Sequence, residues 1–259
     1  MAISLPLLRR LRAPMGLLHG LADLVFAPRC LACGGPAGPR PPVCGRCRSR
    51  LPPPPPPLCP RCGFPRLRTG RDPGARCQEC ADWPIGIRLA RSACLLRGPA
   101  AALVHQLKYR GWRALAGVMA ERMAGVPLPG DVRRETGLIV PVPTTRRRVR
   151  ERGYNQAGLL ARALAESTRR TAFCALSRAA AGTSQTTLQP AARRANVAGA
   201  FSLAADRRHD IAGEHLLLVD DVLTTGATVT ACAEVLVGAG ARCVSVLTFA
   251  RAPGRLRLD

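Results

Sequence analysis

The chain has 259 residues, 47% of them hydrophobic and only 3% aromatic, so a sizeable core is feasible and must be built mainly from Ala, Val and Leu. No apolar run reaches the roughly 18 residues that a membrane-spanning helix needs, so we expect no membrane span. The formal net charge of +23 can arise in two ways. A basic surface attracts the phosphates of nucleic acid, single-stranded DNA included. Alternatively, coding bias spreads arginine over a solvated exterior, since only Lys108 among the 39 basic residues is lysine.

The first 26 residues mix arginine with leucine and look at first like an export signal. Pro14, His19 and Asp23 interrupt their apolar stretch, and no small-residue cleavage site follows convincingly. We therefore predict a short amphipathic leader over residues 1–26 and a cytoplasmic protein.

Eight of the twelve cysteines form four C-x2-C pairs: Cys30/Cys33, Cys44/Cys47, Cys59/Cys62 and Cys77/Cys80. Each pair can turn two thiolates toward one ion, and two pairs complete a tetrahedral Zn²⁺ site. Ten residues separate the first two pairs and fourteen the last two, which favours one zinc for each two neighbouring pairs over an interleaved arrangement. Four thiolates leave no open coordination position, so these zinc ions are structural. We predict a double zinc-ribbon-like module over residues 27–83, whose folding free energy comes mostly from metal binding.

A disulfide framework and a redox centre both fit these cysteines less well than zinc does. Disulfides require an oxidising compartment that nothing else in the chain indicates, and redox chemistry does not use four repeated pairs. The remaining cysteines, Cys94, Cys174, Cys232 and Cys243, lie in apolar contexts and are interpreted as small buried hydrophobes. The six prolines of residues 52–57 predict a stiff, extended spacer between the two clusters.

Beyond Trp83 the pattern alternates between strands and helices, which is typical of an α/β fold with a mainly parallel, doubly wound sheet. We expect strands at residues 88–96, 138–142, 216–219 and 242–249, and helices at residues 100–107, about 153–169, and 226–238. A right-handed crossover joins the last two strands. The predicted domain spans residues 84–252, and residues 253–259 form a tail.

Two further segments of this domain have ligand-binding character. Pro143 and Thr144 lie at the tip of the strand at residues 138–142, and an arginine-rich run able to neutralise a pyrophosphate follows them: Arg146, Arg147, Arg148, Arg150 and Arg152. Residues 179–199 have few apolar groups and no clear period, and connections of this length are commonly lids or disordered spacers. We favour a lid, because this segment offers polar contacts from Gln185, Arg193 and Asn196.

The most informative stretch, residues 216–228, reads LLLVDDVLTTGAT. Its continuous aliphatic run predicts a central parallel strand, so Asp220 and Asp221 emerge at the carboxyl end, where α/β sheets bind ligands and where carboxylates can accept hydrogen bonds from a sugar diol. Backbone N–H groups around Gly226 and the dipole of the following helix suit a phosphate, with hydroxyl donors from Thr224, Thr225 and Thr228. A plain turn in which Asp221 and Thr225 only cap the helix is the alternative.

This stretch is similar to the diphosphoribosyl-binding signature of type I phosphoribosyltransferases. The resemblance implies that Asp220 and Asp221 hold the ribose hydroxyls of phosphoribosyl pyrophosphate (PRPP), and that Thr224, Thr225, Gly226 and Thr228 hold its 5′-phosphate. Further likeness extends over most of the chain and covers the cysteine pairs, LKY at residues 107–109, VPVP at 140–143, RGYNQA at 152–157 and the spaced Thr183, Gln185, Leu188, Arg193, Asn196 and Phe201. Together these segments resemble the ComF family, amidophosphoribosyltransferase-like proteins associated with bacterial DNA uptake.

The resemblance implies Mg²⁺-dependent PRPP chemistry in which Lys108 and Arg152 are candidate catalytic cations, because negative charge grows on the pyrophosphate as it leaves. Three functions remain open at this point. The protein transfers phosphoribosyl to an unidentified acceptor, or it senses PRPP without reacting, or it is an adaptor that handles single-stranded DNA together with DNA-uptake proteins.

Overall fold

The computed structural model describes residues 28–37, 42–66, 77–179, 199–204 and 207–254. The expected leader, residues 1–26, and the last five residues of the expected tail lie outside this range. So do Gln185, Arg193 and Asn196 of the expected lid. In the part that is described, no helix combines the length and the apolarity that crossing a membrane requires.

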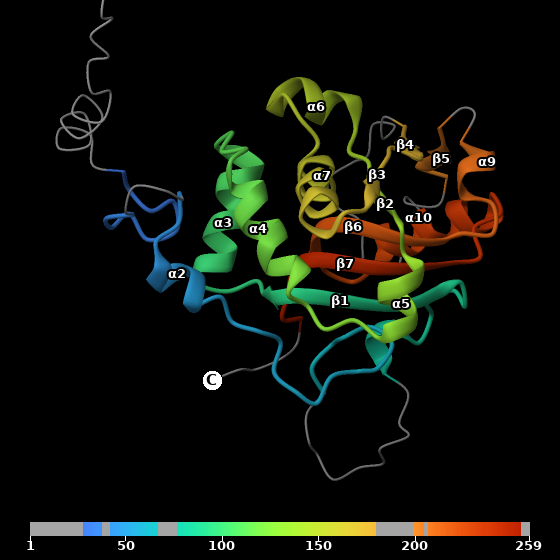
Figure 1. Ribbon diagram of the computed structural model, residues 1–259, viewed down its shortest axis with the longest axis horizontal. Helices are drawn as coiled ribbons and strands as arrows, with labels where there is room; N and C mark the ends of the chain where they lie inside the picture. Colours follow the sequence, from blue (N-terminus) through green and yellow to red (C-terminus); the bar gives the residue numbers. More distant parts are fainter. Residues whose placement is uncertain (1–27, 38–41, 67–76, 180–198, 205–206, 255–259) are drawn as a thin grey trace, which may run out of the picture.

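The centre of the molecule is a five-stranded sheet with the strand order β1-β7-β6-β2-β3 (Figure 1). Its strands are β1 (Ile87–Leu95), β2 (Leu138–Pro141), β3 (Thr171–Ala172), β6 (His215–Leu223) and β7 (Cys243–Arg251). Every neighbouring pair in this sheet is parallel. The predicted α/β class with a parallel sheet is therefore confirmed. A separate antiparallel pair is formed by β4 (Leu176–Arg178) and β5 (Phe201–Leu203).

Helices cover both faces of the sheet, and the residues of β6 show why. Leu217 and Val219 pack in one hydrophobic cluster with α3 (Pro99–Tyr109), α4 (Leu115–Ala124) and α7 (Gln156–Thr168). Leu216 and Leu218 pack in a second cluster with α10 (Ala227–Gly238). Successive strand side chains point to opposite faces, so an uninterrupted aliphatic run is what a strand buried on both sides requires. The other helices among the described residues are short: α2 (Gly45–Ser49), η1 (Gln78–Cys80), α5 (Gly130–Glu135), α6 (Arg146–Arg152) and α9 (Arg208–Ile211).

Two predicted boundaries differ from the structure by three residues or more. The strand predicted at residues 216–219 continues to Leu223, because β6 stays paired with β7 as far as the Leu223–Arg251 register pair. The two aspartates therefore lie inside the last part of the strand and not beyond it. The helix expected from about residue 153 begins at Gln156. Gly153 ends α6 in the left-handed conformation with φ of 79°, which glycine adopts without strain, and Asn155 then caps α7.

The cysteine-rich segment packs against this sheet and is hydrogen-bonded to it. Its residues Cys30, Cys47 and Leu51 belong to the cluster that contains α3 and α4. Cys59, Cys62 and Trp83 belong to the cluster that contains α10. Backbone hydrogen bonds attach the segment to strand β1, since Leu95 N donates to Pro52 O at 2.7 Å and Ala90 N donates to Arg61 O at 2.7 Å. The proline run thus follows the open edge of the sheet.

Three of the four cysteines outside the C-x2-C pairs are withdrawn from solvent as expected. Cys94 and Cys232 are buried and Cys243 is partly buried. Cys174 is exposed, which corrects the prediction that it is a buried hydrophobe. It lies between β3 and β4, where the chain leaves the five-stranded sheet for the β4–β5 pair.

Candidate functional site

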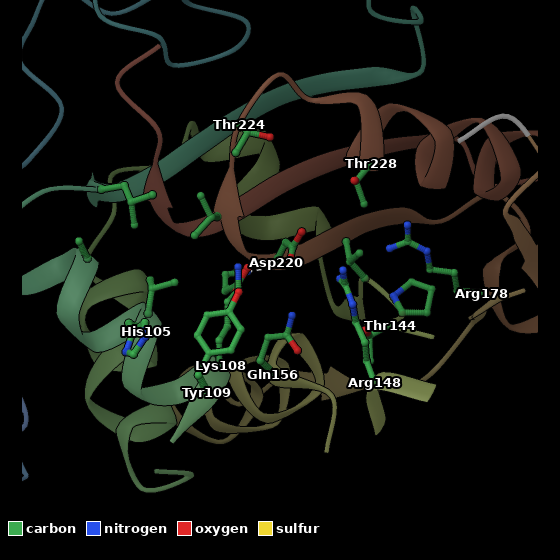
Figure 2. Close-up of a pocket in the computed structure, with 17 residues that line it drawn as sticks. His105, Lys108, Tyr109, Thr144, Arg148, Gln156, Arg178, Asp220, Thr224 and Thr228 are labelled. Atoms are coloured by element: carbon green, nitrogen blue, oxygen red, sulfur yellow. Dashed lines mark hydrogen bonds and ion pairs between the residues drawn. The ribbon is translucent and has the colours of Figure 1, made fainter. Parts of the chain in front are cut away.

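A cavity of about 430 Å³ lies at the carboxyl ends of the central strands (Figure 2). Its polar and charged lining residues come from segments far apart in the sequence: His105, Lys108, Tyr109, Thr144, Arg148, Gln156, Arg178, Asp220, Asp221, Thr224 and Thr228. Leu96, Ala101, Val104, Val142, Pro143 and Val222 supply its apolar wall. The cavity therefore occupies the place where open α/β sheets bind ligands.

Asp220 and Asp221 both line this cavity, but they face different neighbours. Asp221 shares its face of β6 with Leu217 and Val219, and it meets Lys108 from α3 with 2.9 Å between Nζ and Oδ2. This contact is an ion pair but not a hydrogen bond, because the buried Oδ2 of Asp221 accepts no hydrogen bond from the described residues. Lys108 is thus already paired with an acid that lines the site.

Asp220 is oriented by the backbone and accepts a hydrogen bond from Asp221 N at 2.8 Å through Oδ1. Burial, and then the charge of Asp221, raise the pKa of Asp220 well above its usual range. Lys108 opposes this shift. A second carboxylate next to an ionised one is costly to charge, so a cation or a hydrogen-bond donor that enters the cavity lowers the free energy of the ionised pair.

The loop after β6 presents hydroxyls and backbone donors. Thr224 and Thr228 line the cavity, whereas Thr225 is exposed and Gly226 lies buried behind the loop. Gly226 has φ of 87° and precedes α10, so the first N–H groups of that helix are presented at the turn. This combination of small side chains and a helix start is a common binding arrangement for phosphate.

The tip of β2 forms the opposite rim. Pro143 and Thr144 line the cavity, and the buried hydroxyl of Thr144 has no hydrogen-bond partner among the described residues. The tip is fixed by two hydrogen bonds of Val142, whose N donates to Val219 O at 2.9 Å and whose carbonyl accepts from Asn155 Nδ2 at 3.0 Å. An unpaired buried hydroxyl facing a cavity is a group that a ligand can satisfy.

Two arginines stand on the same side of the cavity as Thr144 (Figure 2). Arg148 comes from α6, whose cap Thr145 accepts a hydrogen bond from Arg148 N, and Arg178 ends β4. Burial first, and then the charge of Arg148, lower the pKa of Arg178 from its usual value. Since the two guanidinium groups repel one another, an anion between them would relieve that repulsion.

The paired cysteines form two compact groups, Cys30/Cys33/Cys44/Cys47 and Cys59/Cys62/Cys77/Cys80. Within each group all four sulfur atoms lie within 4.8 Å of one another. Measured Sγ separations are 3.9 Å for Cys33–Cys44, 3.8 Å for Cys59–Cys80 and 3.7 Å for Cys62–Cys77. A tetrahedral zinc site with Zn–S bonds of about 2.3 Å needs sulfur separations of about 3.8 Å, so both groups fit the ion. The grouping is the sequential one.

The sequence comparisons agree with both halves of this architecture. A double zinc ribbon domain model matches residues 21–81, and a phosphoribosyl transferase domain model matches residues 149–259. The chain is 33% identical over 204 residues to DNA utilization protein YhgH of Escherichia coli strain K12, which covers 75% of this chain and 84% of that protein. It is 26% identical over 213 residues to Competence protein ComFC of Bacillus subtilis, covering 80% of this chain and 82% of that protein.

The chain belongs to the ComF family. It is also 35% identical over 115 residues to Competence protein F of Haemophilus influenzae, covering 44% of this chain and 50% of that protein. The structural zinc expected for this ComF chain is supported by the ribbon match and by the geometry of the two cysteine groups.

Residues of the RGYNQA segment of this ComF protein support the cavity from behind through several contacts. In RGYNQA, Tyr154 donates a hydrogen bond from its hydroxyl to Leu107 O, and Asn155 caps α7 while holding the tip of β2. Arg152 does not line the cavity. Its Nη1 donates to Gln156 Oε1 at 3.2 Å, and its guanidinium lies 5.1 Å from the centre of the Tyr109 ring. It therefore stands directly behind two lining residues.

Of the site residues expected from the ComF sequence, the cavity brings together Lys108, Pro143, Thr144, Asp220, Asp221, Thr224 and Thr228. Sequence reasoning assigned no site role to His105, Tyr109, Gln156 or Arg178, although Tyr109 and Gln156 lie in the LKY and RGYNQA segments. His105 and Tyr109 could have been predicted from the sequence. His105 lies three positions before Lys108 and four before Tyr109, a helical spacing that places all three on one face of α3. No sequence pattern pointed to Arg178, because it reaches the cavity only through the pairing of β4 with β5.

Proposed function

We propose that this protein binds PRPP in the cavity and transfers its phosphoribosyl group to an acceptor with release of pyrophosphate. The observation that carries the proposal is the convergence of three kinds of group on one cavity: the Asp220–Asp221 pair, the Thr224 and Thr228 hydroxyls, and the Arg148–Arg178 pair. PRPP has three matching parts, a ribose diol, a 5′-phosphate and a pyrophosphate. The family membership and the phosphoribosyl transferase domain match support the same ligand.

In this proposal the aspartates accept hydrogen bonds from the ribose hydroxyls, and the loop from Thr224 to Thr228 donates to the 5′-phosphate. Pro143 and Thr144 lie against the pyrophosphate, with Arg148 and Arg178 as its cations. Lys108 is the further catalytic cation, and it moves between Asp221 and the leaving group. Arg152 acts by holding Gln156 and Tyr109 in the wall.

The bond between ribose C1 and the pyrophosphate oxygen breaks, and its electron pair leaves with the pyrophosphate. A lone pair of the acceptor forms the new bond to C1, and the acceptor proton passes to solvent. Preorganised cations beside the leaving oxygen lower the barrier, since negative charge grows there in the transition state. Mg²⁺ prefers carboxylate, phosphate and water oxygens, and Asp220 and Asp221 are the carboxylates among the described lining residues, so they would hold the ion with the ligand. When bound, Mg²⁺ offsets the charge on pyrophosphate.

Calorimetry of PRPP binding in the presence of Mg²⁺ tests the proposal. We expect wild-type protein to bind, and the double variant Asp220→Ala/Asp221→Ala to lose binding while its circular dichroism spectrum is unchanged. The matched control is Asp210→Ala/Glu214→Ala, which removes two carboxyl groups from residues that do not line the cavity and keeps affinity. Absence of binding by the wild type, or equal affinity in the cavity variant, contradicts the ligand assignment.

Pyrophosphate release separates an enzyme from a sensor. With a panel of amines and nucleobases as acceptors, we expect release that depends on both PRPP and Mg²⁺. Binding without release for every acceptor would support a PRPP sensor in place of a transferase.

We also propose that the protein acts in DNA uptake or use. The names of its relatives, two competence proteins and a DNA utilization protein, support this, as does the net charge of +23. If the chain itself contacts DNA, its affinity for a single-stranded oligonucleotide falls steeply with added salt. Affinity that does not change with salt would argue against contact with the DNA backbone.

A further inference from the structure

The indole of Trp83 is packed against the back of the loop that follows β6. A Cβ atom on Gly226 would lie 2.6 Å from Trp83 Cζ2 and 2.8 Å from Trp83 Nε1, so the indole fills the space next to this glycine. Trp83 is buried, with 7% of its surface exposed, and it does not line the cavity. Only a glycine permits this approach.

Trp83 is the residue that follows the second cysteine group by three positions, and that group holds it in place. Arg61, between Cys59 and Cys62, donates from Nη1 to Cys80 O at 3.2 Å and from Nη2 to Trp83 O at 2.9 Å and Pro84 O at 2.7 Å. Trp83 N donates to Cys80 O at 3.2 Å. One guanidinium thus fixes the backbone on both sides of Trp83, and its own position depends on the cysteines that flank it.

The same cysteine group is joined to the strands that carry the loop. Arg251, the last residue of β7 and almost fully buried, donates from Nη1 to Cys62 O at 3.0 Å and forms an ion pair with Glu79. Arg251 is also the register partner of Leu223, the residue immediately before Thr224. Two separate contacts, through Trp83 and through Arg251, therefore connect the second cysteine group to the loop.

The first cysteine group has a different neighbour. Its residues Cys30 and Cys47 pack in the cluster on the α3 and α4 face of the sheet, and its Arg48 pairs with Glu121 of α4. The two groups therefore differ in what their loss would disturb.

We infer that Trp83 is a positioning residue for the phosphate loop and that the second zinc ribbon, Cys59/Cys62/Cys77/Cys80, sets its position. This inference rests on the proposed function, because it assigns residues 224–228 to the 5′-phosphate. If the inference is correct, the protein needs zinc in the second ribbon for full affinity toward the 5′-phosphate end of the ligand. The affinity for pyrophosphate, which binds at the rim formed by β2 and α6, does not depend on Trp83.

Separate titrations with ribose 5-phosphate and inorganic pyrophosphate test this. We expect Trp83→Ala to weaken ribose 5-phosphate binding by about tenfold or more and pyrophosphate binding by about twofold or less. Trp83→Phe, which keeps a flat ring, recovers part of the loss. Trp112→Phe is the control, because Trp112 is the other tryptophan of the chain and is 47% exposed. If Trp83→Ala fails to fold, Arg61→Lys serves in its place. It removes the guanidinium that fixes the backbone of Trp83, and we expect the same selective loss of ribose 5-phosphate affinity.

The zinc requirement has a spectroscopic readout. In the Trp112→Phe protein, Trp83 is the sole tryptophan, so emission reports on the contact with Gly226. We expect emission to change when ribose 5-phosphate binds, and Cys77→Ser to change it and to weaken that binding. Cys33→Ser, in the first ribbon, changes neither by more than about twofold.

The outcomes separate the two proposals. If the wild type binds neither PRPP nor ribose 5-phosphate, the proposed function fails. If it binds both, and Trp83→Ala binds ribose 5-phosphate as the wild type does or loses pyrophosphate affinity equally, the positioning role of Trp83 is overturned.

Discussion

Asp220 and Asp221 show how one residue step changes the chemistry of a side chain. They are adjacent in β6, yet Asp221 meets Lys108 at 2.9 Å while Asp220 bonds to the backbone and has a raised pKa. The cause is the two-residue period of the strand, which directs neighbouring side chains to opposite faces. Both residues nevertheless line one cavity.

The raised pKa of Asp220 predicts the pH dependence of stability for the ligand-free protein. The unfolded chain has an aspartate pKa of about 3.9, so the folded state binds this proton more tightly. The contribution of Asp220 to stability is therefore fully present below about pH 3.9 and is lost as the pH rises through the folded-state pKa. We expect Asp220→Asn to become more stable than the wild type over that window, measured as the free energy of unfolding in urea at a series of pH values.

The exposed Asp210 provides the control, since Asp210→Asn alters a surface pair with Arg207. A difference between Asp220→Asn and the wild type that stays constant across the pH series would contradict the raised pKa.

At the scale of elements, Asn155 explains how a helix start can shape a binding site. Its Oδ1 accepts from Ala157 N at 3.2 Å and caps α7, and its Nδ2 donates to Val142 O at 3.0 Å, next to Pro143 of the cavity rim. One amide thus joins α7 to the tip of β2. A carboxylate could perform the first task but not the second, because it has no hydrogen to donate.

Two substitutions separate these tasks. Asn155→Ala loses the cap and the tether, and we expect the free energy of unfolding to fall by about 1–2 kcal/mol. Asn155→Asp keeps the cap and loses the tether, so its unfolding free energy should lie between those of Asn155→Ala and the wild type. Chemical denaturation measures both, and a loss in Asn155→Asp that equals the loss in Asn155→Ala would show that the cap contributes nothing.

At the scale of the whole molecule, the cysteine ribbons and the sheet share their hydrophobic clusters. Cys30 and Cys47 lie in the cluster of α3 and α4, and Cys59 and Cys62 lie in the cluster of α10. A segment that shares a core with its neighbour tends to unfold together with it, so we expect the ribbons and the sheet to unfold as one cooperative unit.

Calorimetric unfolding of the zinc-loaded protein should therefore show one transition. We expect Cys77→Ser to lower the midpoint of that whole transition by about 5 °C or more, since metal binding contributes directly to the folding free energy. Cys174→Ser, the same chemical change at an exposed cysteine outside both groups, leaves the midpoint unchanged. A new low-temperature transition in Cys77→Ser, with the main one unaffected, would indicate an independent ribbon.

Local features of the sequence were enough to predict much of this molecule. The four C-x2-C pairs predicted two groups in sequential order because each pair needs only a short turn. The aliphatic run at residues 216–219 predicted a strand buried on both faces, and similar patterns predicted the parallel sheet with α3, α7 and α10, but not the buried helix α4. The length of β6 could not be predicted in the same way, because its last residues are strand only while β7 pairs with them.

What the sequence by itself determined is therefore the set of chemical groups and the elements that carry them, since patterns of neighbouring residues encode both. The tertiary structure alone decided which groups meet. Arg178 reaches the cavity through the pairing of β4 with β5, Lys108 through the packing of α3 on β6, and Trp83 reaches Gly226 across 143 positions of the chain. Such contacts depend on how the elements pack together, and no local pattern of residues specifies them.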